Sequence, residues 1–184
     1  MAQTFFIADG HFGHRNILNF RKQFKTIKEH DDYIIDNINS VATKRDKIFF
    51  LGDWVFNPQA LSLIARIKCP HKHLVMGNHD DYNADLLSVF NTISGPIKYK
   101  EFWLTHIPVH PMELRGKYNI HGHMHDAVVK DPNYISVCCE QIGYTPISLD
   151  EIRSKIHERK TKPKIIRKAK HGKTGVKKAR SSRI

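Results

Sequence analysis

Short apolar runs recur along the chain, and each of them ends in polar residues. The runs are four or five residues long and rich in β-branched and aromatic side chains, which is typical of buried strands. Apolar residues at helical spacing lie between them, and this alternation indicates an α/β fold. The last helix opens with a capping box formed by Ser148 and Glu151. The predicted strands cover residues 4–8, 47–51, 73–76, 101–105 and 118–121, and the predicted helices cover residues 31–42, 58–67, 83–90 and 148–160.

A polar fragment follows each of the five predicted strands. Open α/β sheets place their ligand sites at the C-terminal ends of strands, so five loops are expected to share one crevice. Asp9 and His11 are two residues apart, as are His123 and His125, and each pair can leave an extended backbone on the same side. Oxygen and nitrogen donors without Cys suit Mn²⁺, Fe, Zn²⁺ or Ni²⁺. The fragments are Asp9-Gly10-His11, Gly52-Asp53, Gly77-Asn78-His79-Asp80, His106 and Gly122-His123-Met124-His125.

In this order the fragments resemble the calcineurin-like metallophosphoesterase superfamily, over roughly residues 1–155. The stretches at residues 9–14, 105–111 and 137–147 are similar to its small single-domain branch of bacteria and phages. The resemblance implies a β-sandwich flanked by helices in αββα layers, and two divalent ions, with Mn²⁺ expected first. It also implies that one ion is held by Asp9, His11 and His125 and the other by Asn78, His106 and His123, with Asp53 bridging and His79 near the leaving group.

Such a ligand set favours phosphoester hydrolysis. Two metals about 3.5–4 Å apart can share a hydroxide formed near neutral pH and clamp a phosphate during in-line displacement. His79 is expected to act as general acid, and Asp80 either orients its imidazole or caps the next helix. The segment that follows Asp9 and His11 contains candidates for contact with the substrate phosphate, although a helix N-terminus also explains polar residues there. The candidates are His14, Arg15 and Asn16.

Departures from the superfamily pattern narrow the function. Protein serine/threonine phosphatases follow Gly-Asp with a second Asp and an Arg, whereas Gly52-Asp53 is followed by residues 54–57, Trp-Val-Phe-Asn. The short spacing between Asp80 and His106 leaves no room for the inserted cap domain of the repair nucleases. Neither a phosphoprotein phosphatase nor a capped nuclease is therefore expected.

The C-terminal part of the chain differs in charge from the rest. The net charge is +12, and residues 161–184 contribute +10 through ten Lys or Arg and no Asp or Glu. Residues 1–160 hold 20 basic and 18 acidic side chains, or +2. We predict one metallophosphoesterase domain at residues 1–160 and a basic, flexible tail at residues 161–184. Such a tail suits a polyanion, most often nucleic acid, and a solubilising role is the alternative.

Composition indicates where the protein works. No apolar run approaches the roughly 20 residues that span a bilayer, and the start lacks the features of a secretory signal. Three Cys form no disulfide framework, which fits a reducing, cytoplasmic setting, and Cys138 and Cys139 are predicted in a strand. Four histidines without a partner pattern are predicted at the surface: His30, His71, His73 and His157.

Taken together, the residues predict a binuclear metal-dependent phosphoesterase that prefers phosphodiesters, with nucleic acid or a nucleotide as its target. One alternative is a phosphatase or cyclic phosphodiesterase on small nucleotides that uses the tail for localisation. The other is a non-catalytic nucleic-acid-binding or scaffold protein on the same fold. Relatives of that kind usually lose ligands or the catalytic histidine, and this chain retains all of them.

Overall fold

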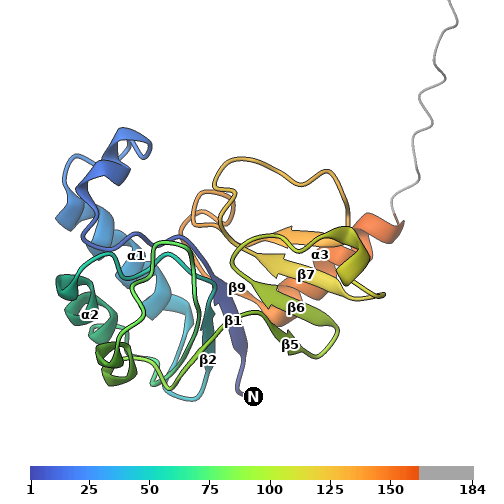
Figure 1. The fold of residues 1–184 in the computed structure, drawn as a ribbon, viewed down its shortest axis with the longest axis horizontal. Coiled ribbons are helices and arrows are strands. Elements are labelled where there is room, and N and C mark those ends of the chain that lie inside the picture. Colours follow the sequence, from blue (N-terminus) through green and yellow to red (C-terminus); the bar gives the residue numbers. More distant parts are fainter. Residues whose placement is uncertain (162–184) are drawn as a thin grey trace, which may run out of the picture.

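The fold is built on two β-sheets, seen in Figure 1, a computed structural model that describes residues 1–161. The first sheet has five strands in the order β4-β3-β2-β1-β9. Its strands β1 to β4 are parallel, and β9 runs antiparallel to β1. The strands are β1 (Thr4–Ile7), β2 (Lys47–Phe50), β3 (His71–Val75), β4 (Thr92–Ser94) and β9 (Ile147–Ser148).

The second sheet has four strands in the order β5-β6-β7-β8. Strands β6, β7 and β8 are parallel, and β5 pairs antiparallel with β6 as a hairpin. The five strands predicted from apolar runs are all present, while four short ones, β4, β5, β8 and β9, were not predicted. The second sheet consists of β5 (Ile97–Tyr99), β6 (Phe102–Thr105), β7 (Tyr118–His121) and β8 (Tyr134–Ser136).

Three α-helices and three short 3₁₀ helices complete the described chain. The first α-helix begins four residues earlier than predicted, because the Thr26 hydroxyl accepts a hydrogen bond from the backbone amide of Glu29 at 3.1 Å and caps it. The predicted helix at 83–90 is instead a 3₁₀ helix of five residues, a length at which an α-helix gains few hydrogen bonds. The helices are α1 (Ile27–Val41), α2 (Pro58–Ala65), α3 (Leu149–Thr161), η1 (Arg15–Asn19), η2 (Ala84–Ser88) and η3 (Pro111–Glu113).

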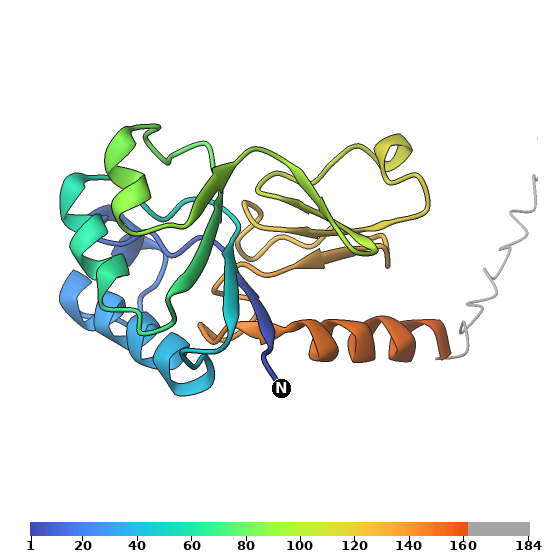
Figure 2. The same cartoon turned by 90° about the horizontal axis from the view of Figure 1, so that it is seen from below.

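Side chains that alternate along β1 enter two separate cores. Phe5 packs with apolar residues of α1 and α2, which lie together on one side of the first sheet (Figures 1 and 2). Phe6 points to the opposite face and joins a cluster that contains residues of both sheets and Ile152 of α3. The first cluster lies between the first sheet and helices α1 and α2, and the second lies between the two sheets and includes residues of α3. The predicted α/β class, with two sheets flanked by helices, is confirmed.

Some sequence predictions fall outside or differ from this structure. Apart from Thr161, the predicted tail at residues 161–184 lies outside the described residues. Cys138 forms an isolated bridge with Ala8, and Cys139 lies in the turn that follows, so the predicted strand ends before them, although both are buried. Within residues 1–161, none of the helices combines the length and the apolar character needed to cross a bilayer.

Candidate metal centre

The predicted polar fragments meet where the two sheets adjoin. Each fragment follows the C-terminal end of one of the parallel strands β1, β2, β3, β6 and β7. The backbone amide of Asp9 donates a hydrogen bond to the carbonyl oxygen of Gly52 at 3.0 Å, and that of Gly122 donates to the carbonyl oxygen of His106 at 2.9 Å. The amide of His123 donates to the Asp9 carboxylate at 3.0 and 3.1 Å. Loops from both sheets are therefore joined at this region.

The backbone at five of the predicted ligands is left-handed rather than extended. The two-residue spacing predicted side chains leaving an extended segment on one side, and this prediction is wrong. Non-glycine residues rarely have positive φ, and the conformation costs about 1–3 kcal/mol at each position. Strain of this kind persists where the surrounding structure enforces it, and it is concentrated at functional sites. Positive φ occurs at Asp9 (61°), His11 (52°), Asp53 (60°), His123 (68°) and His125 (45°).

Glycines allow these loops to approach one another closely. A Cβ at Gly52 would overlap the His106 ring, and a Cβ at Gly77 would overlap the Asp53 carboxylate. Gly52 also has a φ of 87°, which disfavours other residues. These glycines are therefore required by the packing of the candidate ligands against neighbouring backbone.

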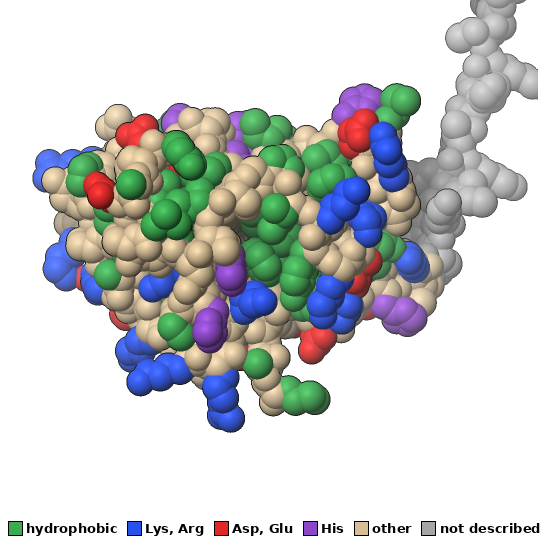
Figure 3. Space-filling view, turned by 60° about the horizontal axis from the view of Figure 1, so that its bottom comes forward, with side chains coloured by type: hydrophobic (Ala, Val, Ile, Leu, Met, Phe, Trp, Pro, Cys, Tyr) green, Lys and Arg blue, Asp and Glu red, His purple; other side chains and the backbone are tan. Residues whose placement is uncertain are grey.

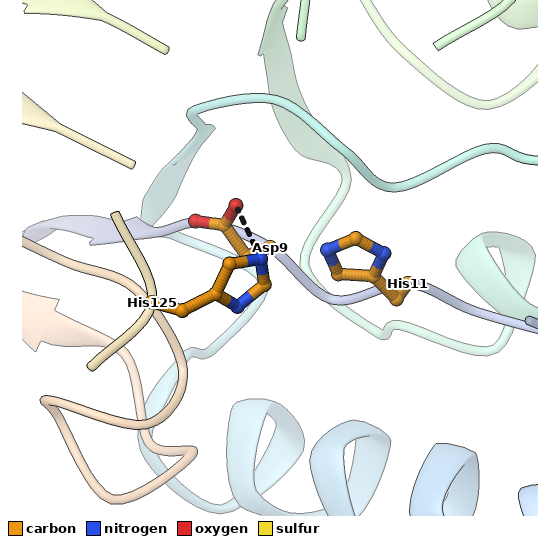
Figure 4. Close-up of side chains that lie close together, drawn as sticks. All are labelled: Asp9, His11 and His125. Carbon is orange, nitrogen blue, oxygen red and sulfur yellow. Dashed lines mark ion pairs between the residues drawn. The ribbon is translucent and has the colours of Figure 1, made fainter. Parts of the chain in front are cut away.

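One group of candidate metal donors consists of Asp9, His11 and His125, which point toward one another in Figure 4. Their donor atoms lie within 4.8 Å of one another, and Asp9 Oδ1 is 3.9 Å from His125 Nε2. Both ring nitrogens of His11 are buried and have no hydrogen-bond partner within residues 1–161. Burial, with the nearby Arg21 guanidinium, lowers the pKa of His11 to about 2, so its imidazole is neutral. A neutral, unpartnered imidazole beside a buried carboxylate fits a metal ion.

The second group surrounds Asp53. Asp53 Oδ2 lies 3.4 Å from His106 Nε2 and 4.0 Å from His11 Nε2, so this oxygen lies between the two groups. His106 Nε2 is 3.0 Å from Asn78 Oδ1 and 3.2 Å from His123 Nδ1. His106 Nδ1 donates to a backbone carbonyl at 2.8 Å, which leaves Nε2 available to a metal ion. The structure therefore brings together all seven predicted ligands.

Glu140 extends the first group, and sequence reasoning did not identify it as a site residue. His125 Nδ1 donates to Glu140 Oε1 at 2.9 Å, which leaves His125 Nε2 directed at Asp9. Burial opposes ionisation of Glu140, but the hydrogen bond from His125 and the charge of Arg21 lower its pKa to about 2. A carboxylate that orients a histidine in this way is common around protein-bound metals. The only signal in the sequence was its place in the stretch 137–147 that carried the resemblance.

A buried hydrogen-bond network also anchors the loop that contains Asp9. Arg21 donates to the backbone carbonyl oxygen of Asp9 at 2.7 Å and pairs with Glu140 at 2.7 Å. Its Nη1 lies 2.7 Å from His30 Nε2, and because arginine only donates, Nε2 accepts and His30 Nδ1 donates to Asp31 at 2.8 Å. His30 is fully buried, so its predicted surface position is wrong. The prediction failed because Arg21, its partner, lies nine residues away in the loop between η1 and α1.

Asp80 is placed to hold the metal-site loops. Its carboxylate accepts hydrogen bonds from the backbone amides of Asp53, Trp54, Val55 and Gly77 at 2.7–2.8 Å. These bonds occupy both oxygens, so neither predicted alternative, orienting His79 or capping a helix, describes the observed contacts.

The ring of His79 instead stacks on Phe56, with centroids 4.9 Å apart. The backbone amide of His79 donates to Asp53 Oδ1 at 3.0 Å. His79, predicted as the general acid, is therefore hydrogen-bonded through its backbone to Asp53, which is predicted to bridge the metals.

A pocket of about 720 Å³ opens beside the metal donors. His11, His79 and His125 line it, and so does His14, whose ring stacks on another lining residue, Phe56, with centroids 4.6 Å apart. The other two predicted substrate contacts, at positions 15 and 16, are exposed and lie outside the lining, because η1 begins there and leads them away into solvent.

Known proteins resemble this chain over most of its length. A protein of unknown function from Aquifex aeolicus has a solved structure with 28% sequence identity and a TM-score of 0.68, covering 84% of this chain and 99% of that one. An uncharacterized protein of Methanocaldococcus jannaschii is 29% identical over 91% of this chain and 96% of its own length. The gene 66 protein of Mycobacterium phage L5 is 27% identical over 70% of this chain and 80% of its own. Residues 3–179 match the calcineurin-like phosphoesterase family, and the chain belongs to that family.

Proposed function

We propose that this protein is a binuclear metal-dependent phosphoesterase that hydrolyses phosphodiester bonds in nucleic acid or nucleotides. The observation that carries the proposal is the pair of donor groups around Asp9 and Asp53, in which a buried His11 has no partner for either ring nitrogen within the described chain. Membership of the phosphoesterase family supports the reaction type. The donor set, with imidazoles, carboxylates and one amide, fits Mn²⁺ first, with Fe, Zn²⁺ or Ni²⁺ as alternatives.

Each part of the site has a task in such a reaction. Two bound ions would supply a hydroxide near neutral pH and neutralise charge on the phosphate. Asp53 lies between the donor groups and holds the backbone of His79 through a hydrogen bond of 3.0 Å. His79 lines the pocket, where it can donate a proton to the leaving oxygen. His14, which also stacks on Phe56 and lines the pocket, is available to the substrate phosphate.

The nucleic-acid part of the proposal rests on charge. Residues 161–184 carry +10, whereas residues 1–160 are nearly balanced at +2. On the face in Figure 3, Lys and Arg side chains of the described residues lie in groups that apolar and neutral surface separates. The concentrated positive charge of the last 24 residues therefore provides the better attraction for a polyanion.

A second function, hydrolysis of a small nucleotide monoester or cyclic nucleotide, is favoured by the pocket. A volume of about 720 Å³ is typical of sites for small molecules. In that case the C-terminal charge would serve localisation or solubility rather than substrate binding.

A substrate panel tests these functions. Turnover is measured on bis(p-nitrophenyl) phosphate, p-nitrophenyl phosphate, 2′,3′-cyclic nucleotides and a labelled oligonucleotide, with Mn²⁺ and with a chelator. Preference for bis(p-nitrophenyl) phosphate and the oligonucleotide supports the first function, and preference for p-nitrophenyl phosphate or the cyclic nucleotides supports the second.

Metal dependence is tested in parallel by substitution. Asp53→Asn and His125→Ala should lower the content of bound metal and the turnover together, while His157→Ala, at an exposed position on α3, should change neither. Full turnover in the presence of chelator, or unchanged metal content in both site variants, would rule out the two-metal assignment.

A further inference from the structure

The pocket beside the candidate metal donors is also lined by residues that belong to neither donor group. They include the apolar or aromatic side chains of Ile17, Phe20 and Tyr144 and the polar side chains of Gln23 and Asp126. The metal donors and His79 need only a phosphate, which fills a small part of about 720 Å³. The remaining space therefore belongs to another part of the substrate.

Phe20 is the unusual residue among them. Its side chain is 82% exposed, although it borders the pocket. Hydrogen bonds fix the backbone here, since the amides of Phe20 and Arg21 both donate to the carbonyl oxygen of Ile17 at 2.9 Å. Arg21 is itself bound to the carbonyl oxygen of Asp9. The backbone that carries this exposed ring is thus anchored to the loop of the first candidate metal ligand, Asp9.

The chemistry around this ring indicates what would cover it. Tyr144 presents a second aromatic surface, and the Arg21 guanidinium lies 5.3 Å from its ring centroid. The Gln23 amide, which donates to the Tyr144 hydroxyl, and the Asp126 carboxylate add hydrogen-bonding groups to the same lining. An aliphatic group would use only the aromatic surfaces, whereas a flat heterocycle can stack on the ring and also hydrogen-bond at its edge.

We propose that Phe20 is a specificity-determining residue that stacks on the nucleobase of a nucleotide phosphodiester held at the metal centre. This inference rests on the proposed phosphodiesterase function and names its substrate class more narrowly. The base lies on Phe20, its edge meets Gln23 or Asp126, and the phosphate lies at the donor groups with His79 near the leaving oxygen.

Two substrates that differ only in the base test the proposal. The first is thymidine 5′-(p-nitrophenyl phosphate), and the second is the same diester on an abasic tetrahydrofuran sugar. The wild-type protein with Mn²⁺ should have a higher kcat/KM for the first. Phe20→Ala should lower the ratio of the two kcat/KM values by about fivefold or more, the smallest effect expected of a stacking contact, and Phe20→Trp should restore it.

Leu87→Ala is the matched control, because Leu87 is another exposed apolar residue, 62% accessible, and lies outside this pocket. It should keep the wild-type ratio. A wild-type ratio near one, or an unchanged ratio in Phe20→Ala, would overturn the proposal while leaving phosphodiester hydrolysis intact.

If neither diester is hydrolysed, it is the proposed function that fails. Stacking is then decided by calorimetric binding of thymidine 5′-monophosphate and the abasic sugar phosphate to the metal-loaded protein. The nucleotide should bind more tightly, and Phe20→Ala should remove the difference. Equal binding of the two phosphates to the wild-type protein would overturn the inference.

Discussion

His125 donates a hydrogen bond through Nδ1 to Glu140 at 2.9 Å, and its Nε2 lies 3.9 Å from the Asp9 carboxylate. The carboxylate fixes the tautomer, because it accepts the only ring proton of a neutral imidazole. Glu140 also pairs with Arg21, which holds the backbone of Asp9. One side chain therefore orients two of the three donors in the first group.

Replacing Glu140 by Gln should weaken metal binding without removing a metal ligand. The glutamine amide accepts a weaker hydrogen bond than the carboxylate, and it can also turn its NH₂ group toward His125. The proton on His125 Nδ1 is then no longer fixed by its partner. We expect metal affinity to fall about 10- to 100-fold. Competition with a chromogenic chelator measures it, with Glu113→Gln, at an exposed residue of η3, as the control. Equal affinity in the two variants would contradict the role assigned to Glu140.

His79→Ala should separate catalysis from metal binding. The side chain stacks on Phe56 outside the two donor groups, so both ions should remain bound. Turnover should fall by about 10²- to 10⁴-fold, the usual contribution of a positioned acid or base. The loss should be smaller for a p-nitrophenyl leaving group, which needs no proton, than for an alkyl one. Equal losses for both leaving groups would argue for charge stabilisation rather than proton donation.

Asp46 should make folding stability depend on pH. Burial raises its pKa, but hydrogen bonds from the Thr43 side chain and from the backbone amides of Gln3 and Thr43 outweigh this and hold it below the ordinary 3.8. A lowered pKa means that this stabilisation is complete above pH 3.8 and is lost as the pH falls through the folded-state value.

The test is Asp46→Asn, which places an NH₂ group where an oxygen accepts from backbone amides at 2.7 Å. The variant should be less stable at pH 7 by about 1–3 kcal/mol, and the difference should shrink toward pH 3. Denaturant unfolding at several pH values measures this, with Asp36→Asn, at an exposed residue of α1, as the control. A difference that is independent of pH would exclude the carboxylate charge as its source.

Removing residues 162–184 should weaken binding to oligonucleotides. Each phosphate neutralised by a Lys or Arg contributes about −0.9 to the slope of log affinity against log salt on duplex DNA, or about −0.7 on single strands. The truncated chain should have a flatter slope, with little change in sequence preference, because contacts to phosphate carry no base information. Hydrolysis of bis(p-nitrophenyl) phosphate should hardly change.

A full-length variant with the ten basic residues of this segment replaced by Gln separates charge from chain length. It should bind oligonucleotides as weakly as the truncated chain. If either variant retained the full affinity and salt slope, the segment would have the solubilising role instead.

The apolar runs predicted the strands that carry the site because each run is largely buried and is followed by polar residues. The short strands β4 and β8 were missed, since a segment of three residues has almost no periodicity of its own and pairs only because a longer strand lies beside it. The same holds for the site. Asp9 and His11 are visible in a motif, but Arg21, His30 and Glu140 act through partners distant in sequence, and no local pattern reports such contacts.

The candidate ligands come from both sheets, with Asp9, Asp53 and Asn78 following strands of the first and His106, His123 and His125 following strands of the second. A metal ion bound between them would add a cross-link to the hydrogen bonds that already join the two halves at this edge, such as those from the His123 amide to the Asp9 carboxylate. Ions that bind only the assembled sandwich raise its unfolding free energy by mass action. Removing them would therefore weaken the contact between the two sheets as well as abolish hydrolysis. The metal concentration would then help to determine the lifetime of the folded protein.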